Sequence, residues 1–174
     1  MSTLKVSTIS PLGTDATKTI TLGESGGTLG IASGAKTSGF GKIGQLITST
    51  SATAATSTSD TYVTTSLSAS ITPSSTSSKV FCIFDLSIYK TGGDNSMGIK
   101  IDRDGTSIKV MDTLATSSSA DNYQTICLSI LDSPSSVSSV PYTIFFRRAA
   151  GSGTVGIQSS SSAQNGITLM EVLD

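Results

Sequence analysis

The sequence predicts an all-β protein: an antiparallel sandwich of about eight to nine strands, preceded by a small β-rich N-terminal segment. Short apolar blocks recur at intervals of about 8 to 12 residues, separated by Ser/Thr/Gly stretches, which is the pattern of a sandwich or barrel. No segment shows a capped 3.6-residue period, so we expect no helix. Apolar residues make up 36% of the chain, which argues against disorder although charged residues are only 13%.

Residues 1 to 42 form the first expected unit. Its short β-like pieces at 4–9, 18–22 and 28–31 alternate apolar and polar residues. About 40 residues with so few large apolar groups cannot bury a sufficient core alone, so the segment needs a partner. That partner is either copies of itself around a threefold axis or a socket on another protein. The residues predicted to anchor it are Leu4, Val6, Ile9, Ile20 and Leu22.

Residues 43 to 174 form the second expected unit, in which the strands lengthen. Strands are expected at 43–47, 62–67, 79–89, 99–102, 107–110, 124–131, 141–148, 154–158 and 167–173. Pro73 marks the end of the second strand region, because a proline ring cannot donate to a ladder. The Asp104-Gly105 dipeptide between two alternating runs predicts a tight hairpin.

The strand at 79–89 carries the strongest pattern. One face is apolar throughout and is assigned to the sandwich core: Val80, Cys82, Phe84, Leu86 and Ile88. The other face begins apolar at Phe81 and Ile83 and then becomes polar. Half of this strand should therefore be covered on both sides, and contact with another subunit would supply the second cover.

Phe145 and Phe146 are neighbours on one strand, so their rings point to opposite faces. A single sandwich has one interior, and one of the two rings must face outward. That ring either lies under a loop of its own chain or makes a contact between subunits. The residues predicted to form a trimer interface are Phe81, Ile83, Phe145, Phe146 and Met170.

The chain lacks the usual chemical groups of an enzyme. Histidine is absent, which removes the commonest general base and the commonest metal ligand. Two cysteines without histidine cannot build an ordinary zinc site. The run from Asp102 to Gly105 resembles the opening of a calcium loop, but the closing glutamate is missing, so a plain hairpin turn is expected. We predict no catalytic, cofactor-binding or metal-binding residues.

Charge and cysteine content narrow the expected partners. A net charge of −1 gives no attraction for nucleic acid, and no apolar run is long enough to insert in a membrane. Cys82 and Cys127 lie in apolar strands and are expected to be two buried, reduced thiols, with a disulfide between adjacent strands as the alternative. Tyrosines could cover a sheet edge or stack on a glycan.

Several strings follow one another in the order found in a known family. They are Gly41-Lys42-Ile43-Gly44-Gln45, Leu67 to Val80, Asp102 to Thr106, Leu131-Asp132-Ser133-Pro134, Tyr142-Thr143-Ile144 and Ile167 to Val172, with Met1 to Ile9, Thr19 to Gly23 and Ile31 to Ala35 in the N-terminal part. Together they resemble phage tail-fibre and related virion structural proteins, as in marine and cyanobacterial phages. Each string is weakly specific, and their shared order over nearly the whole chain carries the resemblance.

The resemblance implies a trimeric jelly roll similar to the heads of complement C1q and tumour necrosis factor. It places a virion-anchoring segment at 1–42 and a head domain at 43–174, and it transfers no catalytic residue. Most tail fibres are far longer and separate anchor from head by a shaft, whereas here the two are almost contiguous. A short head fibre or capsid decoration protein is therefore expected.

The expected function is that of a non-enzymatic structural component of a phage virion. It would be a homotrimer assembled in the host cytoplasm, with capsid or tail proteins as its other partners. The alternative is a host-recognition adhesin that binds a surface glycan or protein through the loops at 90–96, 115–121, 132–139 and 159–165. Binding to host cells distinguishes the second from the first.

Overall fold

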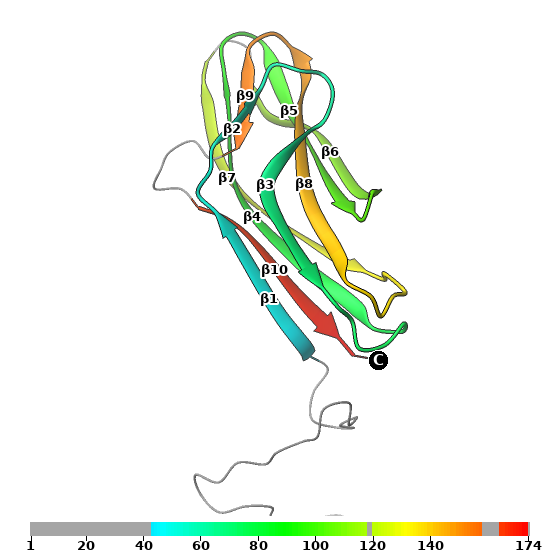
Figure 1. Cartoon of the computed structure of the whole chain (residues 1–174). Coiled ribbons are helices and arrows are strands. Elements are labelled where there is room, and N and C mark those ends of the chain that lie inside the picture. The colour runs from blue at the N-terminus through cyan, green and yellow to red at the C-terminus, as the bar shows by residue number, and fades with distance from the viewer. Residues whose placement is uncertain (1–42, 118–119, 158–163, 174) are drawn as a thin grey trace, which may run out of the picture. The chain divides into compact units, whose positions relative to one another are not determined.

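The computed structural model describes residues 43–117, 120–157 and 164–173, and these form ten β-strands in two antiparallel sheets (Figure 1). The described residues contain no helix. This confirms the predicted all-β sandwich. The predicted anchoring residues, Leu4, Val6, Ile9, Ile20 and Leu22, lie outside the described part of the chain.

The first layer, sheet A, is built around a long central strand. Its six strands are β1 (Ile43–Ser51), β2 (Ala55–Ser57), β4 (Lys79–Thr91), β7 (Asn122–Asp132), β9 (Thr154–Ile157) and β10 (Asn165–Val172). β7 pairs with β4 along one side, while β10 and β9 share the other side of β4 in succession. β1 pairs with β10 at the lower end in Figure 1, and β2 pairs with β9 at the upper end.

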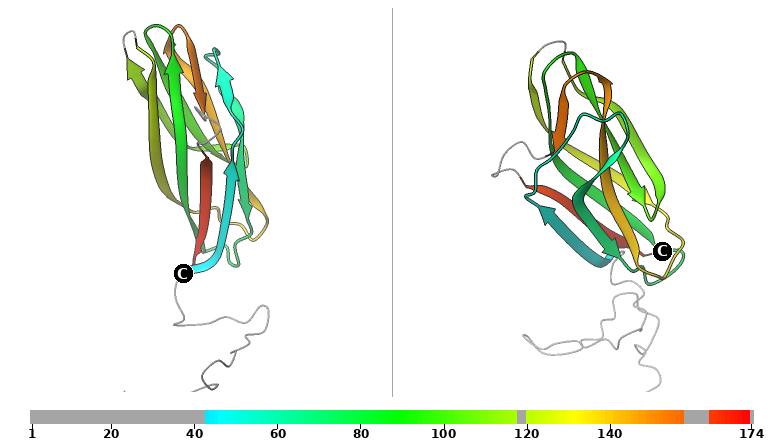
Figure 2. Two further views of the ribbon diagram at one scale, coloured as in Figure 1. Left: turned by 90° about the vertical axis from the view of Figure 1, so that its left-hand side faces the viewer. Right: turned by 45° about the horizontal axis from the view of Figure 1, so that its top comes forward.

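The second layer, sheet B, has four strands in the order β3-β8-β5-β6. They are β3 (Val63–Ile71), β8 (Val140–Gly151), β5 (Asn95–Arg103) and β6 (Thr106–Ser117). The two sheets face one another as two layers (Figure 2). Along the chain, all connections between described strands cross from one layer to the other except β1–β2, β5–β6 and β9–β10, as in a jelly roll.

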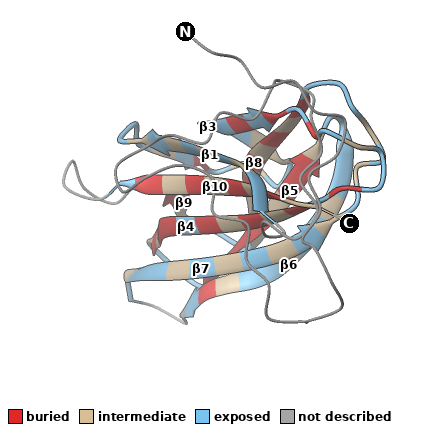
Figure 3. Ribbon diagram, turned by 90° about the horizontal axis from the view of Figure 1, so that it is seen from below, coloured by how far each residue is buried: buried red, intermediate tan, exposed pale blue. Residues whose placement is uncertain are grey.

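The core lies between the sheets and follows the period of two predicted for the strands. Val80, Cys82, Phe84, Leu86 and Ile88 of β4 are all fully buried, as the sequence predicts. Sheet B contributes Leu67, Ile99, Ile101, Tyr142, Ile144 and Phe146 from its inner face. Figure 3 shows buried residues concentrated in β4 and β10, whereas β6 and β7 are mostly intermediate or exposed. Each large core side chain contributes about 1.5–3 kcal/mol through burial.

The predicted hairpin joins β5 to β6. Asp104 has φ 47° and Gly105 has φ 83°, the two left-handed conformations that a tight hairpin of this twist requires. The Gly105 amide donates to Asp102 Oδ1 over 2.7 Å, which fixes the turn. This stretch is therefore a hairpin turn.

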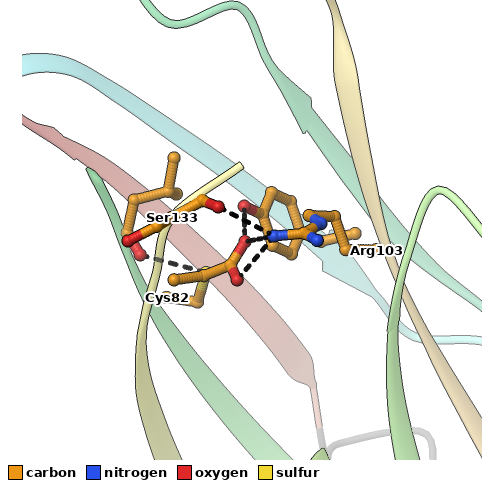
Figure 4. A network of polar contacts seen from close by, with 6 residues as sticks. Cys82, Arg103 and Ser133 are labelled. Atoms are coloured by element: carbon orange, nitrogen blue, oxygen red, sulfur yellow. Dashed lines mark hydrogen bonds and ion pairs between the residues drawn. The ribbon is translucent and has the colours of Figure 1, made fainter. Parts of the chain in front are cut away.

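A polar network joins the two sheets at the lower end of the core (Figure 4). Arg103 Nη1 donates to both carboxylate oxygens of Asp132 at 2.8 and 2.9 Å, and to the Ser133 carbonyl at 3.2 Å. The Tyr142 hydroxyl donates to Asp132 Oδ2 over 2.7 Å. Because Asp132 ends β7 in sheet A while Arg103 and Tyr142 belong to sheet B, the carboxylate holds the layers together.

Burial and the nearby carboxylate control the ionisable core groups around this network. Burial raises the pKa of the Cys82 thiol to about 12, and the charge of Asp132 adds to the effect. Burial also raises the pKa of Tyr142, with a further contribution from its hydrogen bond to Asp132. Cys82 and Tyr142 therefore stay protonated at neutral pH and serve the core as packing groups.

Candidate functional site

The outer face of sheet A carries an apolar surface at its lower end. Leu46 of β1, Met170 of β10, Phe81 of β4 and Leu131 of β7 are directly opposite one another in consecutive strand pairs and form one row across the sheet. We define the apolar band as this row with its same-face neighbours: Ile43, Leu46, Phe81, Ile83, Leu131, Met170 and Val172. The band crosses four strands, so it forms a continuous surface.

The band is exposed to solvent. Ile43 is 57% exposed, Leu46 61% and Leu131 57%, and these are three of the six large apolar side chains that stand out from the described surface. Phe81, Ile83 and Met170, in the middle of the band, are half-buried. Contiguous exposed apolar surfaces of this kind are typical of sites that contact another molecule.

The structure divides the predicted interface residues among three places. Phe81, Ile83 and Met170 gather in the apolar band on sheet A. Phe145 lies on the outer face of sheet B, where Lys100 Nζ approaches its ring centroid to 4.3 Å. Phe146 is fully buried in the chain's own core.

The prediction that Phe146 belongs to an interface is therefore wrong, because a ring enclosed in the core of its own sandwich cannot contact a second chain. The placement obeys the alternation argument, which requires one of the two neighbouring rings to point outward. Phe145 is covered in part by Lys100, and Tyr62 lies under the same ammonium group with 5.6 Å between Lys100 Nζ and the ring centroid. The outward ring is thus packed by polar side chains of its own chain.

Sequence reasoning missed four members of the band: Ile43, Leu46, Leu131 and Val172. Leu46 and Leu131 stand at single apolar positions on otherwise polar strand faces, and single exposed apolar residues are common on any surface. These residues are recognisable as one surface only when the register of β1, β10, β4 and β7 aligns them. The alternating pattern of each strand shows which residues share a face of that strand, but it does not show which residues of neighbouring strands lie opposite one another.

Above the band, the same face becomes polar. The next row contains Thr48, Thr168 and Ser129 beside Ile83, and the row after it pairs Asp85 with Cys127. Cys127 is exposed, which corrects the expectation of two buried thiols: it occupies an outward position of β7, whereas Cys82 occupies an inward position of β4. Both cysteines are free, and they lie on opposite faces of sheet A.

We expect one thiol per native chain to react with a disulfide reagent at neutral pH. Cys127 is accessible but slow, because its hydrogen bond to the Asp85 carboxylate, with smaller contributions from desolvation and the carboxylate's charge, raises its pKa. Cys82 should react only after unfolding, since burial shields it. The absorbance of the chromophore that the reagent releases, recorded for the native and the urea-unfolded protein, counts the accessible and the buried thiols. The variant Cys127→Ser should abolish the native reaction, and a persisting native thiol would contradict the assignment.

Two of the edge strands, β7 of sheet A and β6 of sheet B, differ in how regularly they pair with their neighbours. β7 pairs with β4 without interruption from Asn122 to Asp132 and is paired on one side only among the described strands. β6 is the corresponding edge of sheet B, and three register shifts interrupt its pairing with β5. Thr113 at φ 70° and Ala115 at φ 49° add left-handed residues to β6. The regular edge is therefore the one that carries Leu131 of the apolar band.

Glu171 lies on the inward side of β10, beneath the band, and is almost fully buried. Its Oε1 accepts hydrogen bonds from the Ser74 amide at 2.6 Å and the Ser74 hydroxyl at 2.7 Å. Its Oε2 accepts from Gln45 Nε2 at 3.3 Å. Burial favours the neutral acid, but these hydrogen bonds outweigh it and lower the pKa of Glu171. The carboxylate thereby fixes the connection between β3 and β4 against the end of sheet A.

This arrangement predicts an acid-dependent loss of stability. The folded-state pKa of Glu171 lies below its unfolded value of about 4.3, so its stabilisation is present above that pH and is lost as the pH falls through the folded-state pKa. Glu171→Gln should cost about 1.5–3 kcal/mol at neutral pH and flatten the stability profile below about pH 4.5. Urea unfolding across that pH range measures it. Asp104→Asn, at an exposed turn, is the control and should leave the profile unchanged.

No group of three or more histidine, cysteine, aspartate or glutamate side chains is placed to hold a metal ion within the ranges 43–117, 120–157 and 164–173. In the same ranges no helix has the length and apolar character to cross a bilayer.

Comparison with known proteins adds one distant structural likeness. No protein-family model and no curated protein sequence matches the chain, so the resemblance to phage virion proteins rests on the sequence strings themselves. One matching solved structure is that of VP2 from infectious bursal disease virus in a subviral particle, with 16% identity and a TM-score of 0.32. The match covers 75% of this chain and 37% of VP2, so the chain spans little more than a third of that protein's length.

Proposed function

We propose that the protein is a non-enzymatic structural component of a phage virion, a short homotrimeric fibre or capsid decoration protein attached through residues 1–42. The observation that carries the proposal is the apolar band on sheet A. Water-exposed leucine, isoleucine and phenylalanine side chains aligned across four strands stabilise an assembly when a second surface covers them.

A second copy of the chain is the proposed cover. The band ends at β7, whose regular edge is unpaired on its outer side among the described strands, so the apolar surface reaches the rim of the sandwich. A head-to-tail contact between one copy's band and the next copy's rim closes into a ring. The resemblance to trimeric jelly-roll heads, drawn from the sequence strings, favours three copies.

The chemistry of the surface fits a structural role. The outer face of sheet A above the band is lined mainly by threonine, serine and glycine, which hydrate without carrying charge. Of the ion pairs among the described residues, two lie within sheet B, one joins Arg148 of sheet B to Asp60 in the β2–β3 connection, and one bridges the two sheets at the lower end. A neutral, hydroxylated exterior on a rigid sandwich is suited to a permanent particle component.

Light scattering of the full chain tests the assembly. At micromolar concentration we expect three times the chain mass of 17.7 kDa. A stable single-chain mass would contradict the proposal. Attachment is tested separately with full chains in which Leu4, Val6 and Ile9 are replaced by serine. These should remain trimeric but fail to sediment with purified particles, and unchanged sedimentation would refute the anchor.

A further inference from the structure

A pair of tyrosines forms a second distinctive feature of sheet A, at the upper end of the outer face. Tyr89 of β4 and Tyr123 of β7 are directly opposite one another, and their rings stack with 5.6 Å between centroids and 16° between planes. Tyr123 is 57% exposed, whereas Tyr89 is half-buried. The pair therefore presents one aromatic surface that is supported from behind and open to solvent.

Gly156 fixes the position of the stack. It faces Tyr89 across the β4–β9 pair, and a Cβ atom built there would lie 2.4 Å from Tyr89 Cζ. The absence of a side chain lets the Tyr89 ring lie against the backbone of β9, and burial raises the pKa of its hydroxyl. A ring held by backbone below and by a second ring beside it loses little freedom when a ligand stacks on it.

Polar groups adjoin the stack. The next cross-strand pair on the same face is Ser87 with Thr125, and the pair after that is Asp85 with Cys127. Thr125 and Asp85 are exposed, and a carboxylate can accept further hydrogen bonds beside the one it receives from Cys127. Among the described residues of this face the one cation is Lys79, at the opposite end of β4. The surroundings of the stack thus disfavour an anionic ligand.

We propose that Tyr89 and Tyr123 form a binding site for a neutral hexose of an oligosaccharide. A pyranose ring has one face of C–H groups, which packs on an aromatic ring, and a rim of hydroxyls, which pair with hydroxyl and carboxylate groups. The stack supplies the first surface and Thr125 supplies a hydroxyl for the second, while Asp85, about 13 Å from Tyr89 along β4, can pair with the hydroxyls of the next sugar unit. Uronic acids, sialic acids and phosphorylated sugars are disfavoured, because the described outer face carries the Asp85 carboxylate and its one cation, Lys79, lies at the opposite end of β4.

The site is separate from the apolar band. Phe81 and Tyr89 are eight positions apart on β4, which is about 26 Å along an extended strand. The described chain begins at Ile43, within the band, and the tyrosine pair lies at the opposite end of the outer face of sheet A. The inference does not require the trimer, because both rings belong to one chain.

Calorimetric titration of the full-length protein tests the site. The probes are the hexasaccharides of β-1,4-glucan, α-1,4-glucan and β-1,4-galactan, each to about 10 mM, with hexagalacturonate as the anionic comparison. We expect at least one neutral probe to bind with a millimolar or lower dissociation constant, and hexagalacturonate not to bind. Absence of binding by all three neutral probes, or tighter binding of hexagalacturonate, would overturn the proposal.

Variants assign the binding to the stack. Tyr123→Ala should weaken the neutral probe about tenfold or more, while Tyr123→Phe, which keeps the ring, should stay within about threefold. Val110→Ala, at a 50% exposed apolar position on sheet B, should bind as the unsubstituted protein does. Equal affinity of Tyr123→Ala and the unsubstituted protein would refute the site. Light scattering on the same samples reports the trimer independently.

Discussion

Replacing Asp132 with alanine is expected to lower the free energy of unfolding by about 3 kcal/mol. The carboxylate accepts from Arg103 and Tyr142 at once, and its side chain is only 11% exposed. Its removal leaves the Tyr142 hydroxyl without its acceptor and Arg103 with the Ser133 carbonyl alone. A buried donor that loses its acceptor costs more than the intact hydrogen bond contributes, so the loss of stability should be large.

The chain provides a matched control in a second arginine–aspartate pair. Arg148 donates to Asp60 at 2.9 Å, but the Asp60 side chain is 75% exposed. Asp60→Ala should therefore cost less than about 1 kcal/mol, because solvent replaces the lost partner. Urea unfolding of the two variants, followed by circular dichroism, gives both values. Equal losses would show that the network at Asp132 does not hold the sheets together.

Replacing Phe81 with aspartate is expected to convert the proposed trimer to single chains. Phe81 lies within the row of Leu46, Met170 and Leu131, and a carboxylate there would have to be desolvated at the contact without a partner. Such a charge costs several kcal/mol in each of the three contacts, which is comparable with the whole effect of a dominant interface residue. The measurement is the mass by light scattering at micromolar concentration.

Val110→Asp is the control for this substitution. Val110 is 50% exposed and lies on β6 of sheet B, so the same charge enters at a similar apolar position outside the band. The Val110 variant should keep the trimer mass. A Phe81→Asp chain that folds and remains trimeric would show that the band is not part of the contact between chains. An unsubstituted chain that is monomeric would contradict the proposed trimer itself.

Local pattern predicted the sandwich and much of its interior. The alternation from Val80 to Ile88 assigned the core face of β4, because a half-buried strand imposes a period of two on its own sequence. The Asp104-Gly105 turn was readable because its conformation needs those residue types. Both features depend on neighbours in the chain, so a single sequence contains them.

Features without a local cause were not predictable. β2 (Ala55–Ser57) is a short strand in a Ser/Thr/Ala stretch and forms because β9 offers it an edge. β6 extends to Ser117, beyond the expected strand at 107–110, and its pairing with β5 over this length contains three register shifts. Tertiary context overrides weak strand propensity in such places.

The candidate site shows the same division. Phe81 and Ile83 were recognisable as outward apolar residues of a strong strand, and the structure places both in the apolar band. Cys127 was assigned inward because an apolar strand edge gives no indication of which face is buried until its register with β4 is known. The tyrosine stack needed that register too, since Tyr89 and Tyr123 are distant in the chain.

The contrast between the edge strands β6 and β7 bears on whether an isolated chain aggregates. The register shifts and left-handed residues of β6 make its edge irregular, so a strand of another chain cannot readily pair with it. β7 pairs with β4 without a register shift, its residues from Tyr123 to Leu131 include no charged side chain, and no described strand pairs with its outer side. A single chain that exposes this edge is thus prone to aggregate, and the proposed trimer would also protect the chain against amyloid-like stacking.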